Sequence, residues 1–373
     1  MTFMAENKTT KTKVSTEPYK GVRDFYPADM AILNYIFSVW RKTAESFGYQ
    51  EYNASVLELA DLYRAKSGTE IVSEQMYVFK DKGDREVALR PEMTPTVARM
   101  IAAKRKELAF PIRWYSIPNA FRYERPQKGR TREFFQFNAD VFGIDGIEAD
   151  IEIINLAYTM MKNFGFKDDQ FRIGINVSKG VDNKKIDEAI SKLSDLGIKN
   201  AGFDSEIVRG MDYYTGVVFE VYDTSKENPR AIFGGGRYDN LLDIFGTEKI
   251  SAVGIGMGDV IARDMLETYG LIPDLKSAAD LYICTMDEKS INYAENLAQK
   301  SRASGIRTIV DYSNKKIGDQ IKYASKNNIP FIAVIGENEV KTGKLKIKEL
   351  SSGKETDVTE DSLSKAINAS RTK

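Results

Sequence analysis

Histidine is absent from all 373 positions of this sequence, and cysteine occurs once, as Cys284. Without imidazole, the chain has no side chain whose ordinary pKa lies near neutrality, so its chemistry depends on carboxylates, Arg, Lys, Tyr and groups of its substrates. A single thiol excludes an internal disulfide and a cysteine–histidine zinc site. Cys284 stands in the apolar run 281–284, which is typical of a small buried core residue rather than a nucleophile.

Long hydrophobic runs are also missing. No stretch of about 18 apolar residues occurs, so the sequence predicts no transmembrane helix and no membrane partner. Residues 1–17 are rich in Lys and Thr and have no apolar core, which predicts a flexible tail on a cytoplasmic protein. Lys and Arg number 54, as do Asp and Glu, so the net charge of zero neither supports nor excludes nucleic-acid binding.

The hydrophobic spacing predicts an α+β first domain over residues 18–270. Apolar residues recur at helical spacing over 29–47, 95–109, 148–164 and 184–196, and another helix begins near Asp259. Strand-like runs lie at 76–79, 86–89, 112–123, 134–142, 213–222 and 231–233, of which the first two read as a hairpin. This arrangement favours an antiparallel sheet carrying helices. Residues 166–206 read as a short insertion region.

The pattern changes after residues 270–279, which contain Pro273 and predict a domain boundary. Strands at 281–285, 306–310 and 331–335 alternate with helices at 288–304 and 317–327. A further strand at 344–350 and a last helix from about Thr359 follow. The alternation predicts a small α/β domain over residues 280–373 with a largely parallel core.

The chemistry concentrates in a basic loop between two strands. Five of the residues from 122 to 132 are cationic, namely Arg122, Arg125, Lys128, Arg130 and Arg132. Such a loop can hold a polyphosphate or a nucleic-acid end against a sheet. By composition alone, a solvated charged hairpin is the more frequent interpretation.

The strand that follows the loop separates its side chains by polarity. Gln136, Asn138 and Asp140 share one face, whereas the apolar side chains of residues 135, 137, 139 and 141 share the other. Amide and carboxylate groups on a sheet face are costly to bury without a ligand. The pattern therefore indicates a polar sheet floor beside a cationic loop.

These residues resemble known motifs. Residues 122–142 resemble motif 2 of class II aminoacyl-tRNA synthetases, residues 21–27 resemble motif 1, and residues 89–94 resemble the amino-acid-binding segment of histidine- and proline-type members. The longest matches, 208–220 and 234–239, resemble the two signatures of histidyl-tRNA synthetases. The resemblance covers about residues 18–373 and implies a C-terminal anticodon-binding type domain.

The resemblance implies a role for each matched residue. It implies ATP and Mg²⁺ as cofactors, and L-histidine, a histidine-specific tRNA and a second copy in a homodimer as partners. Arg122 and Arg209 would stabilise charge on the α-phosphate. Arg122, Glu124 and Arg130 would bind ATP, and Gln127 and Lys128 would meet the tRNA acceptor end. The implied histidine-binding residues are Glu92, Met93, Thr94, Gln136, Asp140, Tyr213, Tyr214 and Tyr238.

Three positions depart from the family pattern. Ile261 stands where many members carry an ATP-binding arginine, and Arg263, two residues on, would face elsewhere on a helix. The region between Gly143 and Arg209 is shorter than in most members, which insert a helical domain there. Asp140 replaces a common glutamate and reaches less far.

Other functions remain as alternatives. A non-catalytic regulatory paralogue would bind histidine without activating it. A tRNA-binding scaffold without catalysis is motivated by Ile261, and a synthetase for proline or threonine is disfavoured by the 208–220 match. Taken singly, Tyr213 and Tyr214 could be core aromatics, and residues 234–236 could be only a tight turn.

Overall fold

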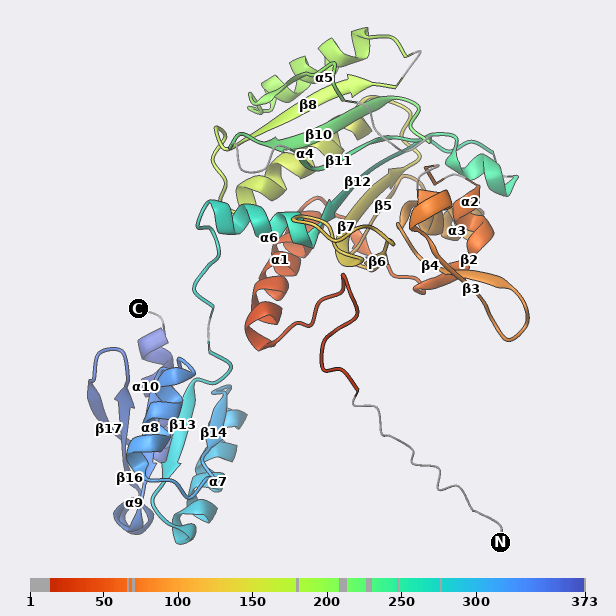
Figure 1. Ribbon diagram of the computed structural model, residues 1–373. Coiled ribbons are helices and arrows are strands. Elements are labelled where there is room, and N and C mark those ends of the chain that lie inside the picture. The colour runs from red at the N-terminus through yellow and green to blue at the C-terminus, as the bar shows by residue number, and fades with distance from the viewer. Residues whose placement is uncertain are drawn as a thin grey trace, which may run out of the picture. The chain divides into compact units, whose positions relative to one another are not determined.

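The computed structural model describes residues 14–65, 67–68, 71–178, 181–207, 213–225, 230–246, 248–275 and 277–371. Contacts divide the chain into two compact units, Met1–Pro273 and Asp274–Lys373. Each unit has a sheet and hydrophobic clusters of its own (Figure 1). No helix in the described part of the chain is long and apolar enough to cross a membrane.

The first unit is built on a mostly antiparallel sheet, as predicted. Within the described residues its strand order is β1-β5-β7-β12-β11-β10-β8-β9, and β6 pairs with β7 beside this path. Only the edge pairs β1–β5 and β8–β9 are parallel. The strands are β1 (Gln50–Glu51), β5 (Ile112–Ser116), β6 (Asn119–Phe121), β7 (Glu133–Phe142), β8 (Phe171–Val177), β9 (Ala201–Phe203), β10 (Val217–Asp223), β11 (Ala231–Arg237) and β12 (Ala252–Gly258).

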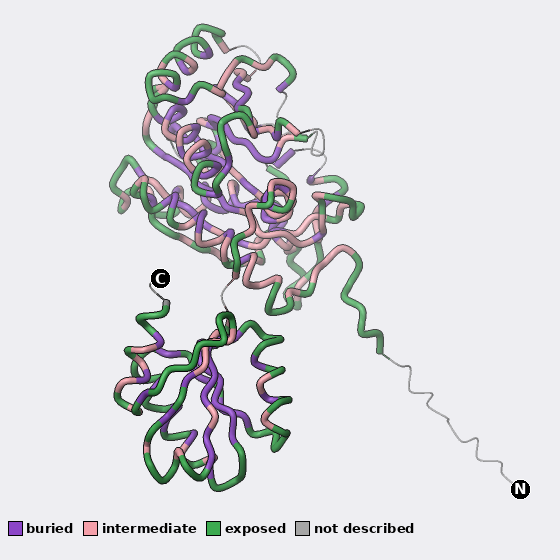
Figure 2. The backbone as a smooth tube through the Cα atoms, turned by 90° about the vertical axis from the view of Figure 1, so that its left-hand side faces the viewer, coloured by how far each residue is buried: buried purple, intermediate pink, exposed green. Residues whose placement is uncertain are grey.

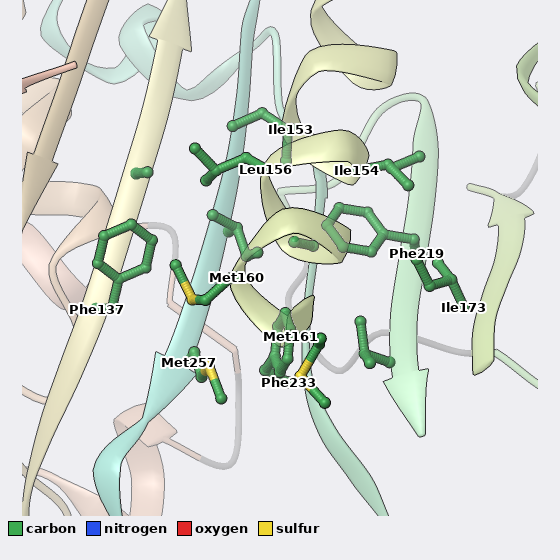
Figure 3. Packing of buried hydrophobic residues seen from close by; sticks show 14 of the residues in the cluster. Phe137, Ile153, Ile154, Leu156, Met160, Met161, Ile173, Phe219, Phe233 and Met257 are labelled. Carbon is green, nitrogen blue, oxygen red and sulfur yellow. The ribbon is translucent and has the colours of Figure 1, made fainter. Parts of the chain in front are cut away.

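Helices α1 (Pro27–Ser46), α4 (Glu148–Asn163) and α6 (Asp259–Thr268) cover one face of this sheet (Figure 1). In α4 the apolar residues Ile153, Leu156 and Met160 recur at helical spacing and are fully buried. Figure 3 shows them packed against side chains of the central strands, including Phe137 and Met257. This packing explains why residues 135, 137, 139 and 141 of β7 are apolar and leaves the opposite face available for polar groups. Helix α5 (Lys184–Asp195) packs at the β8–β9 edge.

The opposite face of the sheet is only partly covered. Helix α3 (Thr94–Lys104) and the short helix η2 (Leu241–Phe245) enclose a second cluster that includes Ile101, Phe142 and Tyr238. A three-stranded sheet in the order β2-β4-β3 lies before α3 in the chain. Its elements are β2 (Leu57–Leu59), α2 (Ala60–Arg64), η1 (Ile71–Gln75), β3 (Tyr77–Lys80) and β4 (Glu86–Leu89), and β3–β4 is the predicted hairpin.

A buried ion pair fixes the end of β11. The guanidinium of Arg237 donates to the Asp150 carboxylate of α4 at 2.5 Å and to the carbonyl oxygen of Gly146 at 2.8 Å. Both side chains are almost fully buried. The next residue in the chain is Tyr238, so this pair anchors the backbone that positions Tyr238.

The second unit has the predicted parallel core. Its strand order is β14-β13-β15-β16-β17, in which β14, β13 and β15 are parallel and β16 and β17 extend the sheet in antiparallel fashion. Figure 2 shows that the strands of this unit are largely buried and that exposed residues lie outside them. The elements are β13 (Leu281–Thr285), α7 (Glu288–Ala303), β14 (Thr308–Val310), α8 (Ile317–Lys326), β15 (Phe331–Ile335), α9 (Glu337–Thr342), β16 (Lys344–Glu349), β17 (Glu355–Thr359) and α10 (Glu360–Arg371).

Several sequence-based predictions need correction. The run 112–123 is two strands rather than one, because Pro118, which has no N–H to donate, lies between β5 and β6. Residues 213–216 precede β10 instead of belonging to it. The glycines 234–236 are part of strand β11, so the tight-turn alternative is wrong. Strands β8 and β12 were not predicted. Cys284 is buried as predicted, and burial raises the pKa of its thiol to about 12.

Candidate functional site

A small polar pocket lies on the sheet face opposite α4. Side chains from four separate parts of the chain meet there: the β4–α3 connection, the region around β6 and β7, the segment before β10, and the ends of β11 and β12. We call this the amino-acid pocket. It is lined by Glu92, Thr94, Arg122, Gln136, Asn138, Asp140, Tyr213, Tyr214, Tyr238, Gly254, Ile255 and Gly256.

Asp140 is the most deeply placed acid of the amino-acid pocket. Its carboxylate accepts a hydrogen bond from the Tyr238 hydroxyl, and both side chains are buried. Burial raises the pKa of Asp140 from its usual 3.8 to about 7, against the lowering effect of the Tyr238 hydrogen bond. Asp140 therefore changes charge near neutral pH in a chain that has no histidine.

Glu92 is a second buried acid in the same pocket. Its carboxylate accepts hydrogen bonds from Ser67 at 2.6 Å and Tyr213 at 3.1 Å. Burial raises the pKa of Glu92, while the Ser67 hydrogen bond and the nearby Arg122 charge lower it. A buried carboxylate held in this way is a ready acceptor for a cationic or N–H donor ligand.

The floor of the amino-acid pocket depends on glycine. A Cβ atom at Gly254 would lie 2.1 Å from the Asp140 carboxylate, and one at Gly256 would lie 2.6 Å from the Gln136 amide nitrogen. The polar side chains of β7 can thus lie across β12 only because β12 has no side chains at these positions. The amide oxygen of Gln136 is buried and accepts no hydrogen bond from any described residue, so it is open to a ligand donor.

Arg122 stands where the amino-acid pocket opens into a larger cavity. Its guanidinium donates to the carbonyl oxygen of Pro91 at 3.0 Å and lies 5.3 Å from the ring centre of Phe134. Arg122, Gln136 and Gly256 line both hollows. A ligand with one end in the amino-acid pocket therefore extends past Arg122 into the larger space.

The larger space, which we call the nucleotide cavity, has a volume of about 560 Å³. The names of the two hollows follow the ligands that the family resemblance implies. The basic loop contributes Lys128 and Arg130 to its wall, and Glu124 accepts a hydrogen bond from Arg130 at 3.2 Å. Apolar side chains line another part. The remaining lining residues include Phe134, Glu220, Tyr222, Arg230, Ile232, Phe233, Gly234, Gly258, Val260 and Ile261.

Ile261 lies in the nucleotide cavity and Arg263 does not. Arg263 forms ion pairs with Asp29 of α1 at 3.0 Å and with Glu267 at 2.8 Å. It faces away from the cavity, as the helical spacing predicts. The start of β7 is held to α6, because the N–H of Phe135 donates to the Asp259 carboxylate at 2.8 Å.

The structure brings most of the predicted site residues together. Glu92, Thr94, Gln136, Asp140, Tyr213, Tyr214 and Tyr238 line the amino-acid pocket, and Glu124, Lys128 and Arg130 line the nucleotide cavity. Met93 does not line either hollow, because its side chain is buried in the core at the start of α3. Gln127 pairs its backbone with Arg130 in the loop turn. Arg209 lies outside the described residues.

Sequence reasoning missed some lining residues. Gly254 and Gly256 were seen only as part of a motif, although their spacing of two in a strand matches the spacing of Gln136, Asn138 and Asp140. Arg230 carried no motif signal, because it lies before β11 and outside the matched segment 234–239. Only the fold places it in the nucleotide cavity.

Comparison with known proteins shows which family the chain belongs to. The family model described as "Histidyl-tRNA synthetase" matches residues 21–181 and 176–258. The chain belongs to the histidyl-tRNA synthetase family. This is a family of aminoacyl-tRNA ligases, and a model described as "Anticodon binding domain" matches residues 280–370.

Individual members of the histidyl-tRNA synthetase family align over most of the chain. A histidine–tRNA ligase from Leptospira biflexa is 39% identical, covering 91% of this chain and 94% of the relative. The ligase from Thermoplasma volcanium is 34% identical, covering 92% and 96%. The alignment with the Leptospira ligase runs over 412 positions, more than the 373 residues here, so that relative has residues that this chain lacks.

Solved structures of histidyl-tRNA synthetases share the fold. The apo enzyme from S. aureus superposes with a TM-score of 0.83 at 28% identity, covering 95% of this chain and all of that one. The enzyme from Nostoc sp. PCC 7120 gives a TM-score of 0.78 at 21% identity, covering 95% and 99%, which shows the fold alone.

Proposed function

We propose that the protein is a histidine–tRNA ligase, which activates L-histidine with ATP and transfers it to its tRNA. The observation that carries this proposal is that two hollows meet at Arg122. One is a small pocket lined by buried acids, phenols and an amide, and the other is a larger cavity with cationic side chains in its walls. Family membership and the ligase relatives support the same function.

The amino-acid pocket suits histidine. An imidazole offers N–H donors, for which Asp140 and the phenols are matched partners. The α-ammonium group requires acceptors, which Glu92 and the open amide oxygen of Gln136 provide. A pocket whose buried polar groups need these partners discriminates against amino acids that lack them. Tyr213, Tyr214 and Tyr238 enclose the ring, and Thr94 lines the same pocket.

The nucleotide cavity suits ATP. Arg122 is placed to stabilise the charge that develops when the histidine carboxylate attacks the α-phosphorus and diphosphate leaves. Arg209 is proposed to stabilise the same charge, because it belongs to the matched signature at residues 208–220. Mg²⁺ favours carboxylate and phosphate oxygens, and Glu124 and Glu220 are the carboxylates that line this cavity.

In the second step a ribose hydroxyl of the tRNA end attacks the acyl carbon of the adenylate, and AMP leaves. No imidazole is present to take the hydroxyl proton, so a phosphate oxygen of the adenylate is the proposed acceptor. Gln127 and Lys128 of the basic loop are the proposed contacts to the acceptor end.

We propose that the protein forms a homodimer, on the basis of the motif 1 resemblance. Light scattering tests this proposal.

The second unit carries a cavity that suits the anticodon. Its volume is about 520 Å³, and it is lined by Tyr282 of β13, the end of β14 and residues of α8. Tyr312 and Tyr323 are more than half exposed, and the ring of Tyr323 lies 5.4 Å from that of Tyr282. Exposed aromatic rings beside a cation such as Lys315 are a platform on which nucleobases stack.

The regulatory-paralogue alternative is not favoured. The curated relatives above are ligases, and the match to an anticodon-binding domain covers residues 280–370. The scaffold alternative rested on Ile261, and other residues that line the nucleotide cavity, such as Lys128 and Arg130, carry positive charge.

Histidine-dependent exchange of pyrophosphate into ATP tests the proposed function. We expect exchange with histidine and not with proline, threonine or the other amino acids. Arg209→Ala should abolish exchange while leaving tRNA binding nearly unchanged. Calorimetric binding of histidine without exchange in the unaltered protein would contradict the proposal and favour a regulatory role.

A further inference from the structure

Cationic side chains from two separate segments line the nucleotide cavity, and glycines form part of its floor. The floor crosses three neighbouring strands, where Gly256 of β12 pairs with Gly234 of β11 and with Asn138 of β7. The basic loop, which leads into β7, supplies Lys128 and Arg130. Arg230 immediately precedes β11, on the far side of β12 from β7. Cations therefore line the cavity from both neighbours of β12, whose Gly256 carries no side chain.

The cations of the nucleotide cavity differ in how far protein groups neutralise them. Arg130 is held by Glu124, whose side chain is only 12% exposed. Arg122 is directed to the Pro91 carbonyl and the Phe134 ring. Arg230 has no hydrogen bond or ion pair to any other residue in the described parts of the chain. An arginine that lines a cavity without a carboxylate partner is available to an anionic ligand.

The family resemblance predicts an arginine at one position of α6. The residue that stands there carries no charge. Val260 and Ile261 give the cavity an apolar surface there, and Arg263 is bound to Asp29 and Glu267. A polyphosphate that enters past Arg122 must therefore find its other cationic contacts on the loop and at the start of β11.

We propose that Arg230 binds the terminal phosphates of ATP, in place of a cation on α6. This inference rests on the proposed ligase function and adds a residue to it. The α-phosphate stays beside Arg122 at the junction of the two hollows, and the β- and γ-phosphates extend over Gly234 and Gly256. A guanidinium at Arg230 then contacts phosphate oxygens that AMP does not have.

The test compares Arg230→Ala and Arg230→Lys with the unaltered protein. Arg85→Ala is the matched control, because Arg85 is an exposed arginine of the same unit in the β3–β4 turn, outside both hollows. Histidine-dependent pyrophosphate exchange gives the KM values for ATP and for histidine. Competitive inhibition by AMP reports binding of the nucleoside and α-phosphate alone.

We expect Arg230→Ala to raise the KM for ATP by about tenfold or more, which is the effect of losing one charge-assisted contact. The KM for histidine and inhibition by AMP should stay within about twofold of their original values, and Arg230→Lys should recover part of the ATP affinity. An unchanged KM for ATP would overturn the inference, as would equal weakening of ATP and AMP. Absence of histidine-dependent exchange in the unaltered protein would instead contradict the proposed function.

Discussion

The Tyr238 hydroxyl donates a hydrogen bond to the Asp140 carboxylate across the intervening strand β12. The two residues stand 98 positions apart in the sequence and meet because Gly254, between them, has no side chain. Asp140 is thus held at the base of the amino-acid pocket with a pKa of about 7.

Histidine binding should depend on pH through Asp140. The ionised carboxylate accepts an imidazole N–H better than the neutral acid, so the KM for histidine should rise as the pH falls through about 7. Pyrophosphate exchange measured between pH 5.5 and 8.5 checks this. Free histidine also titrates in this range, so the comparison is with Asp140→Asn, which should bind histidine weakly at every pH and lose the Asp140 part of the profile.

Asp140 also makes stability depend on pH. Its folded-state pKa is above the usual value of 3.8, so the folded protein holds the proton that the unfolded chain releases. The free energy of unfolding should therefore decrease, relative to Asp140→Asn, as the pH rises from about 4 to about 7. Urea denaturation at several pH values measures it. A difference between the two proteins that is constant with pH would contradict the raised pKa.

Glu92→Gln should weaken histidine activation. The substitution keeps the size and an acceptor oxygen for Ser67 or Tyr213 but removes the charge that is proposed to bind the α-ammonium. We expect the KM for histidine to rise by about tenfold or more, with little change in the KM for ATP. Glu58→Gln is a suitable control, because Glu58 pairs with Arg99 outside the pocket.

Gly254→Ala should abolish histidine activation. The new methyl group would lie 2.1 Å from the Asp140 carboxylate, so that side chain must leave the position in which Tyr238 holds it. Gly202→Ala, in strand β9, is the matched control, because no described atom lies within 4 Å of its Cβ position. Normal exchange activity in Gly254→Ala would show that the pocket tolerates a different placement of Asp140.

Asp150→Asn should destabilise the first unit strongly. It removes the closer of the two carboxylates that pair with the buried Arg237 guanidinium and leaves only Asp239, at 3.4 Å. Breaking a buried pair from one side costs about 3–5 kcal/mol. Denaturation followed by tryptophan fluorescence measures the change. Glu148→Gln breaks the exposed pair between α4 and Lys192 and should leave the midpoint almost unchanged.

Tyr323→Ala should separate tRNA recognition from amino-acid activation. Losing one stacking platform is expected to raise the KM for tRNA by about fivefold or more, on the basis of about 1–3 kcal/mol per stacked base. Pyrophosphate exchange, which needs no tRNA, should be unaffected. Unchanged aminoacylation kinetics would exclude Tyr323 from the anticodon contact.

Much of the fold was predictable because long amphipathic helices and strands give a clear periodic pattern of apolar residues in the sequence. The apolar spacing of residues 148–164 and the alternation in 134–142 predicted α4 and β7 within one residue at either end. Strand β12 was missed for a physical reason. It carries three glycines, which have low strand propensity, and Gly254 and Gly256 are needed because side chains of β7 lie across them.

The residues of the site were predictable where they belong to a recognisable sequence motif or follow strand periodicity. The face shared by Gln136 and Asp140 followed from strand periodicity, and the pocket residues outside β7 and β12 came from the family resemblance. Arg230 could not be found in this way, because its place in the nucleotide cavity follows only from the pairing of β11 with β12. The different burial of Met93 and Thr94 was likewise invisible, since both belong to one matched segment.

The pocket that is proposed to receive histidine is built from phenols, carboxylates and amides, with no imidazole anywhere in the chain. Every imidazole resonance in a magnetic-resonance spectrum of the complex must then come from the ligand. The protonation state, tautomer and exchange rate of bound histidine can be followed without isotopic editing of the protein, and the titration of Asp140 can be observed from the ring that it faces.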